Sequence, residues 1–251
     1  QGVLENFKPR LILVHGDTST TFAASLSAFH KQIKIGHVEA GLRTHDLKSP
    51  WPEEANRKLT SVITDFHFTP TIFSKKNLLD ERISKDKITV TGNTVIDALV
   101  MIREKIKNNP KTFNKLNKNF KNFDWNKKII LVTGHRRENF GKGIQNICKA
   151  LENTAKNFPE CEIIFPIHLN PKIKDKVETF LKNISNIHLI KPLGYEEFIC
   201  LMDMSYVIIT DSGGIQEEAP SLGKPVLVTR NTTERPEAVD AGTVKIVGSN
   251  T

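Results

Sequence analysis

Cysteine is scarce in this chain, and long apolar runs are absent. The 251 residues include three cysteines, Cys148, Cys161 and Cys200, and no two of them form a Cys-x-x-Cys pair. The sequence therefore indicates neither a zinc site nor a disulfide framework, and reduced cysteines are typical of a cytoplasmic protein. No apolar run approaches the roughly 18–20 residues of a membrane span, and no signal peptide opens the chain.

Two well-known nucleotide fingerprints are also missing. The chain has no G-x-x-x-x-G-K-[ST] sequence, which excludes a P-loop. It has no G-x-G-x-x-G after a predicted strand, which excludes a recognisable dinucleotide site. Redox chemistry with a bound dinucleotide is therefore not indicated.

Positive charge is in excess, with a net charge of +8. A basic protein is a candidate for nucleic-acid binding. Much of the excess, however, lies in residues 103–128, which are rich in lysine and asparagine. A solvated helix and loop explains such a segment without a partner, so we expect neither a nucleic-acid nor a membrane partner.

Short apolar runs alternate with helical patterns along the whole chain. The first half has four predicted strands, at residues 11–14, 33–38, 65–69 and 88–90. The second half has six, at residues 129–132, 162–167, 186–190, 206–209, 226–228 and 244–247. This alternation predicts the α/β class, with parallel sheets in two doubly wound, Rossmann-like domains. We place a partial N-terminal domain at residues 1–93 and an incomplete, nucleotide-sugar-binding C-terminal domain at residues 94–251.

The polar turn after the predicted strand 206–209 is the strongest candidate for a ligand site. Ser212, Gly213 and Gly214 place backbone N–H groups and a hydroxyl at the start of a short helix, an environment that favours an anion. Two glycines also let phosphate oxygens approach the backbone closely. Glu218 lies one turn further on and could accept from the paired hydroxyls of a sugar. These residues predict a diphosphate site whose attached sugar is held by an acid, although an ordinary strand–turn–helix corner would look the same.

Acidic residues follow the first two predicted strands, at the edge of a parallel sheet where ligands bind. Asp17 and Glu39 could therefore face one cleft, although each could instead cap a helix or form a loop ion pair. Glu53 follows a loop stiffened by prolines, and a stiff loop suits an acid or base that needs a fixed direction. For Glu54 we predict only a favourable charge at a helix N-terminus.

Further candidates lie in polar turns of the second half. His135 follows a predicted strand and precedes two arginines, so it could contact phosphate, transfer a proton or cap a helix. Leu193 lies in a turn that can offer backbone groups to a planar base, with Phe198 as an apolar wall or as core packing. Arg235 could bind a sugar or phosphate, or pair with a neighbouring acid. Two Rossmann-like halves without a redox fingerprint indicate a nucleotide-sugar cleft between domains.

Six motifs occur in order along nearly the whole chain. They are HGDT at 15–18, GHVEAGLR at 36–43, PWPEE at 50–54, GHRRE at 134–138, DSGGIQEEA at 211–219 and TTERPE at 232–237. Together they resemble those of the non-hydrolysing bacterial UDP-N-acetylglucosamine 2-epimerases. The resemblance implies a GT-B fold with the active site in the cleft between the two domains, a homodimer, and no metal or redox cofactor.

The resemblance also implies a reaction and a role for each matching residue. UDP-N-acetylglucosamine would be reversibly epimerised at carbon 2 to UDP-N-acetylmannosamine, for cell-surface polysaccharide, by elimination of UDP and its re-addition to 2-acetamidoglucal. The acid–base set would be Asp17, Glu39 and Glu53, with His135 near the diphosphate. The nucleotide and sugar contacts would be Leu193 (through its backbone), Phe198, Ser212, Gly213, Gly214, Glu218 and Arg235. Which acid takes or returns each proton stays open.

The sequence departs from the family pattern at its ends. Members begin with a strand and a Gly-Thr-Arg-Pro-Glu turn, and this sequence has neither. We therefore expect a fragment without N-terminal and C-terminal segments, inactive or nearly so by itself. A hydrolysing 2-epimerase, a GT-B glycosyltransferase and a non-catalytic nucleotide-sugar-binding module remain as alternatives.

Overall fold

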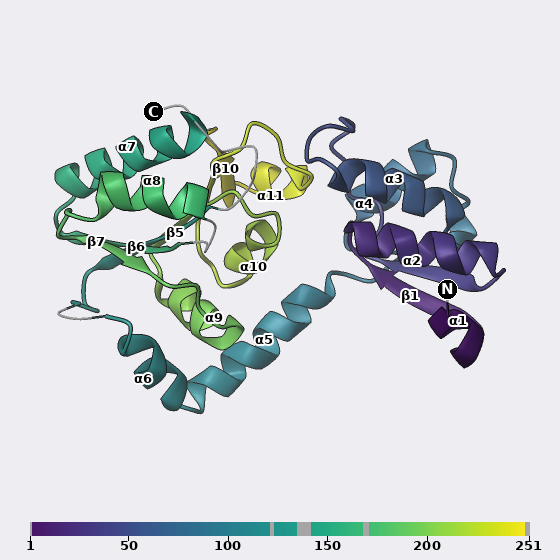
Figure 1. Cartoon of the computed structure of the whole chain (residues 1–251), viewed down its shortest axis with the longest axis horizontal. Coiled ribbons are helices and arrows are strands. Elements are labelled where there is room, and N and C mark those ends of the chain that lie inside the picture. The colour runs from purple at the N-terminus through teal and green to yellow at the C-terminus, as the bar shows by residue number, and fades with distance from the viewer. Residues whose placement is uncertain (1, 121–122, 135–141, 168–170, 249–251) are drawn as a thin grey trace. The chain divides into compact units, whose positions relative to one another are not determined.

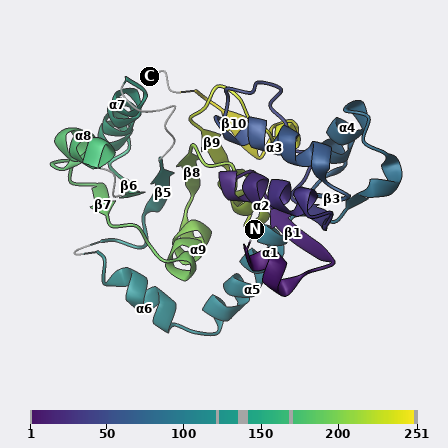
Figure 2. The same ribbon diagram turned by 45° about the vertical axis from the view of Figure 1, so that its right-hand side comes forward.

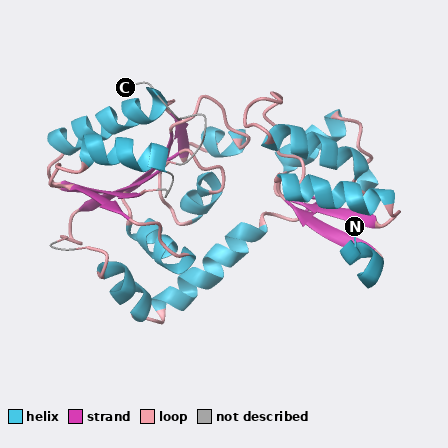
Figure 3. Cartoon of the chain, viewed as in Figure 1, coloured by secondary structure: helices cyan, strands magenta, loops and turns pink. Residues whose placement is uncertain are grey.

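Two compact units, Gln1–Thr94 and Val95–Thr251, make up the chain. The structure is a computed structural model that describes residues 2–120, 123–134, 142–167 and 171–248. Each unit consists of a parallel sheet and helices that follow its strands (Figures 1 and 3). Among the helices of the described ranges, none is long and apolar enough to cross a membrane.

The first unit is built on a sheet with the strand order β1-β2-β3-β4. Its elements are α1 (Gly2–Phe7), β1 (Leu11–His15), α2 (Ser19–His30), β2 (Lys34–Val38), α3 (Glu53–Ile63), β3 (Phe66–Thr69), α4 (Ile72–Asp80), a 3-10 turn (Lys85–Lys87) and β4 (Ile88–Val90). The hydroxyls of Thr18 and Thr71 cap α2 and α4 by accepting from backbone N–H groups of the first turn. Because the strands are parallel, the loops after β1 and β2 leave the same edge of the sheet.

The second unit has a larger sheet with the order β10-β9-β8-β5-β6-β7, which can be followed in Figure 2. Its strands are β5 (Lys128–Thr133), β6 (Cys161–Pro166), β7 (Ile187–Ile190), β8 (Val207–Thr210), β9 (Val226–Val228) and β10 (Val244–Ile246). Its helices are α5 (Thr94–Lys107), α6 (Lys111–Asn117), α7 (Lys142–Asn157), α8 (Pro171–Leu181), α9 (Tyr195–Met204), α10 (Ile215–Ser221) and α11 (Pro236–Asp240). The strand order reverses between β5 and β8, and ligands of such sheets bind beyond the carboxyl ends of the strands at this switch point.

Apolar side chains cover both faces of the larger sheet. Leu131, Ile164 and Ile208 belong to one cluster, together with residues of α5, α6, α9 and α10. Ile130 and Ile163 belong to a second cluster, together with residues of α7 and α8. A strand that is buried on both faces is apolar at successive positions, which explains why these strands were readable as continuous runs.

The predicted alternation of strands and helices is confirmed for each of the ten described strands, with boundaries that differ by at most one residue at either end. The segment 103–128 differs from the expectation of a solvated helix and loop. Leu116 of α6 is fully buried, and Phe113, Phe120 and Trp125 pack against the same core. The segment therefore carries its charges together with apolar side chains that pack on one face of the larger sheet.

Two histidines are buried as neighbours in the smaller sheet. His37 on β2 pairs in register with His67 on β3, and both are almost completely buried. The His37 ring lies 2.8 Å from the carbonyl oxygen of Gly16 through Nε2. Burial lowers the pKa of both rings to about 4. The charged or titratable groups that also act on this pair are His15, Asp17, Arg43, Asp65 and Lys87.

We expect the first unit to lose stability as the pH falls from 6.5 to 4. Unfolded histidine has a pKa of about 6.5, so the unfolded chain binds protons in this window while the native state does not. The stabilisation is complete above pH 6.5 and falls by about 2–3 kcal/mol per histidine at pH 4.5. Hydrogen exchange of the β2 and β3 amides at pH 7.0 and 4.5 measures this loss. His67→Gln should reduce it and His30→Gln, at an exposed position, should not; equal losses in both variants would contradict the assignment.

Candidate functional site

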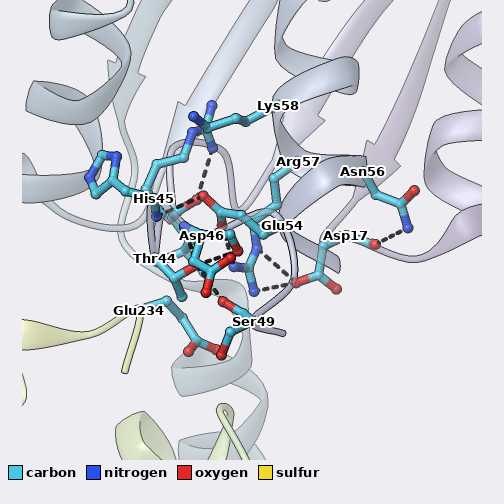
Figure 4. A network of polar contacts seen from close by, with 12 residues as sticks. Asp17, Thr44, His45, Asp46, Ser49, Glu54, Asn56, Arg57, Lys58 and Glu234 are labelled. Atoms are coloured by element: carbon cyan, nitrogen blue, oxygen red, sulfur yellow. Dashed lines mark hydrogen bonds and ion pairs between the residues drawn. The ribbon is translucent and has the colours of Figure 1, made fainter. Parts of the chain in front are cut away.

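Asp17 follows β1 and is held in a fixed direction by an arginine. Arg57 of α3 donates to Asp17 Oδ2 from Nε at 2.9 Å and from Nη2 at 2.6 Å. The amide of Asn56 donates to the Asp17 carbonyl oxygen at 2.8 Å (Figure 4). The Arg57 side chain is 3% exposed, whereas that of Asp17 is 25% exposed. Arg57 therefore fixes the direction of the Asp17 carboxylate, which is still partly exposed to solvent.

Glu54 is the second acid on the same arginine. Its side chain is fully buried, and Arg57 Nη1 donates to Glu54 Oε2 at 3.0 Å. Glu54 Oε1 accepts from the backbone N–H of His45 at 3.1 Å, which ties the loop before α3 to that helix (Figure 4). The prediction of a mere helix N-terminal charge was incomplete, because Glu54 also anchors the loop that leads to Glu53. Glu53 itself is half-buried and is the first residue of α3.

Glu39 follows β2 in an uncommon conformation. Its φ of 65° is in the left-handed region, where a non-glycine residue is strained. Glu39 Oε1 accepts from the Asn93 amide at 3.3 Å, and Glu39 Oε2 lies 3.7 Å from His15 Nε2. A Cβ at Gly16, whose φ is 69°, would lie 3.2 Å from the same Oε2. The sequence did not predict His15 or Asn93; both lie at the carboxyl ends of strands, which is the signal that could have found them.

The Ser-Gly-Gly turn of the second unit lies at the topological switch point of its sheet. Thr210 ends β8 beside Thr133 of β5, and their hydroxyl oxygens are 2.6 Å apart. The backbone N–H of Ser212 donates to Thr210 Oγ1 at 2.9 Å. A Cβ at Gly213 would lie 2.7–2.8 Å from two neighbouring side chains, but one at Gly214 would make only ordinary contact at 3.7 Å. A Cβ at 213 would therefore displace the ends of the Glu234 and Arg235 side chains, whereas a Cβ at 214 would displace neither.

The Arg235 side chain packs against Gly213. It is 5% exposed, it donates from Nη1 to Glu234 Oε1 at 2.8 Å, and it also pairs closely with Glu217 of α10. Thr233 Oγ1 donates to Gln216 Oε1 at 2.6 Å, which fastens the same loop to α10. Of the alternatives for Arg235, pairing with a neighbouring acid is thus observed, and contact with a sugar or phosphate stays a prediction.

Glu218 of α10 has a partner that the sequence did not reveal. The hydroxyl of Tyr195, the first residue of α9, donates to Glu218 Oε1 at 3.3 Å. Glu218 is 8% exposed, and burial raises the pKa of its carboxyl group. Leu193 and Phe198 flank Tyr195 and are half-buried against the core, so the packing role considered for Phe198 is confirmed.

His135 lies outside the described residues. Within those residues, no group of three His, Cys, Asp or Glu side chains is placed to hold a metal ion. The described candidates form two sets, acids and their partners in the first unit, and the turn with Glu218 and Arg235 in the second.

The family model described as UDP-N-acetylglucosamine 2-epimerase matches residues 1–251. The chain belongs to this family. The UDP-N-acetylglucosamine 2-epimerase of Yersinia pestis is 58% identical to it over 248 residues, which are 99% of this chain and 66% of that protein. The chain therefore spans slightly less than two thirds of the length of this 2-epimerase.

Solved 2-epimerase structures have the same fold. The crystal structure of UDP-GlcNAc 2-epimerase from Neisseria meningitidis bound to UDP-GlcNAc matches with a TM-score of 0.96 and 57% identity, over 99% of this chain and 67% of that one. The Methanocaldococcus jannaschii enzyme in complex with UDP-GlcNAc and UDP matches with a TM-score of 0.88 and 38% identity, over 99% and 68%. These matches confirm the predicted α/β class with Rossmann-like units.

Arg57 should be essential for the stability of the first unit. Arg57→Met removes the cation that pairs with Asp17 and leaves Glu54 buried without it, a change that costs about 3 kcal/mol or more. Urea unfolding measures this loss. Lys58→Met is the matched control, because Lys58 lies next along α3, is 38% exposed and reaches Glu81 only at 3.9 Å. Equal unfolding midpoints for the two variants would show that the buried network is unimportant.

Proposed function

We propose that this chain carries the UDP-binding and acid–base residues of a non-hydrolysing UDP-N-acetylglucosamine 2-epimerase. The reaction would interconvert UDP-N-acetylglucosamine and UDP-N-acetylmannosamine by inversion at carbon 2. The observation that carries this proposal is the Ser212-Gly213-Gly214 turn at the switch point of the larger sheet, with a buried acid and a buried arginine beside it. Relatives with the same fold were solved with UDP-GlcNAc bound, which gives the proposal its substrate.

The second unit would bind the nucleotide. The diphosphate would lie on the backbone of the turn, where glycine at 214 leaves room that the chain does not itself need. The seven-residue helix α10 is short, so we attribute binding to the N–H groups of the turn and to Arg235 rather than to a long helix dipole. Glu218 would accept from the ribose hydroxyls. The base would contact the Leu193 backbone and Phe198, and His135 would act near the diphosphate.

The first unit would supply the proton chemistry. The hydrogen on carbon 2 is weakly acidic, so its removal needs a carboxylate in a fixed position. Removal of this proton and cleavage of the bond between carbon 1 and UDP leave a carbon 1–carbon 2 double bond, that of 2-acetamidoglucal. UDP then adds back to carbon 1 while a proton enters the opposite face of carbon 2. We assign these two proton transfers to the set of Asp17, Glu39 and Glu53.

The remaining proposals concern the setting of the enzyme. We propose a cytoplasmic homodimer whose product serves cell-surface polysaccharide. Support for the compartment comes from Cys148, Cys161 and Cys200, which are all free and buried. Sedimentation of the full-length protein tests the dimer, and a monomer at micromolar concentration would contradict it.

Incubation of the full-length protein with UDP-N-acetylglucosamine in D2O tests the reaction. Proton NMR should show UDP-N-acetylmannosamine and deuterium at carbon 2 of both nucleotide sugars, because the lost proton is replaced from solvent. Glu39→Gln and Glu53→Gln should each slow this exchange by at least about 100-fold while UDP binding is kept. Glu5→Gln, an exposed acid on α1, is the control. Free sugar and UDP would indicate a hydrolysing enzyme, and an unchanged spectrum would contradict epimerisation.

Gly214→Ala should weaken nucleotide binding without lowering the stability of the protein. The added Cβ would block the approach of a phosphate to the backbone but would lie 3.7 Å from Glu218 Oε2, at ordinary contact distance. Calorimetry should show at least a tenfold loss of UDP affinity with an unchanged melting temperature. Gly213→Ala should lower both, because its Cβ would lie 2.8 Å from Arg235 Nη1. Undiminished UDP affinity in Gly214→Ala would remove the turn from the phosphate site.

A further inference from the structure

One hydrogen bond joins two parts of the second unit that the proposed function assigns to different portions of the nucleotide. Tyr195 begins α9, two residues after Leu193, whose backbone is assigned to the base. Glu218 lies on α10 and is assigned to the ribose. The Tyr195 hydroxyl donates to Glu218 Oε1 at 3.3 Å, across 23 positions of sequence. The position of the acid therefore depends on the turn that precedes α9.

The two acids that follow Tyr195 on α9 have partners on other helices. Glu196 pairs with Lys105 of α5, and Glu197 pairs with Lys115 of α6. Both acids are thereby held toward the helices that precede the sheet. Tyr195, in the same turn, instead donates to Glu218 of α10.

The contact leaves Glu218 able to bind more. A tyrosine hydroxyl donates one hydrogen, whereas a carboxylate can accept about four, so the acid keeps acceptor sites for two further donors. Burial, and the presence of Glu218, raise the pKa of Tyr195, so its hydroxyl remains a donor at neutral pH. Two adjacent hydroxyls on a ring are the donor pair that the two oxygens of one carboxylate fit.

We propose that Tyr195 is a positioning residue for nucleotide recognition. Its hydroxyl holds the Glu218 carboxylate so that the acid accepts from both hydroxyls of a ribose cis-diol. The site thereby selects a ribonucleoside diphosphate over the 2′-deoxy form. This inference rests on the proposed function, which assigns the sugar contact to Glu218.

The selection follows from the burial of the acid. A ligand without the 2′-hydroxyl leaves an acceptor of the 8% exposed Glu218 without its donor, and a buried polar group that loses its partner is costly. If the carboxylate were free to rotate, it could find a hydrogen-bond donor in another rotamer, and the preference for the ribose form of the ligand would weaken. The Tyr195 hydrogen bond disfavours such a rotation.

Calorimetry with UDP and 2′-deoxy-UDP tests the proposal on the full-length protein. Unaltered protein should prefer UDP by at least tenfold, and Glu218→Gln should abolish the preference. Tyr195→Phe should reduce the preference several-fold, with a melting temperature close to that of the unaltered chain because Tyr195 is 46% exposed. Tyr206→Phe, at the sequence's second tyrosine and 58% exposed, should change nothing.

The pH dependence of UDP affinity gives a second readout. Affinity should fall as the pH falls through the raised pKa of Glu218, because the protonated acid loses acceptor sites. The Tyr195 hydrogen bond favours the ionised form and Arg235 does the same, whereas Glu217 opposes it. Tyr195→Phe should therefore move the midpoint to higher pH than in the unaltered chain. Protonation of UDP itself is common to both proteins and cancels in the comparison.

The outcomes separate the inference from the function on which it rests. An unaltered chain that binds UDP and 2′-deoxy-UDP equally would overturn the inference. So would a Tyr195→Phe variant that keeps both the ribose preference and the pH midpoint, since a purely structural tyrosine predicts that result. Absence of UDP binding to the unaltered chain would instead overturn the proposed function, and the inference with it.

Discussion

Parallel pairing of the strands is the constraint on which the rest of this structure depends. In a parallel sheet every strand ends at the same edge, so the loops that follow the strands gather there. In the first unit this brings the loops of Asp17 and Glu39 to one edge, after β1 and β2. In the second it brings Thr133 beside Thr210, directly before the Ser212 turn. The candidate residues are thus placed by backbone pairing first and only then adjusted by side-chain contacts.

In both units the side-chain contacts include a buried arginine that pairs with two carboxylates. Arg57 lies between Asp17 and Glu54, and Arg235 between Glu217 and Glu234. A guanidinium group presents five donors in one plane, so it can fix the direction of two acids at once, whereas the three donors of a lysine share one rotatable nitrogen. Because desolvation offsets much of the attraction in a buried pair, the gain is direction more than net stability.

The difference between backbone pairing and side-chain contacts explains what the sequence could predict. The central strands of the larger sheet were predictable because burial on both faces makes them continuous apolar runs. Asp17 and Glu39 were predictable because each follows a predicted strand. The side chains that pair with the acids could not be predicted. Arg57 lies 40 residues from Asp17 and Tyr195 lies 23 from Glu218, and no local pattern records which side chains meet when helices pack. For the same reason the apolar side of α6 was hidden among its lysines and asparagines.

Glu39 combines a strained backbone conformation with a position at the carboxyl edge of the smaller sheet. A non-glycine residue in the left-handed region costs of order 1–3 kcal/mol, and glycine would remove that cost. The conformation directs the carboxylate toward His15 and Asn93, and Gly16, itself at positive φ, supplies the space. The two distances are 3.7 Å to His15 Nε2 and 3.3 Å to the Asn93 amide. The proposal that Glu39 takes part in proton transfer uses this arrangement, a carboxylate in a fixed direction beside a histidine at the carboxyl edge of the sheet.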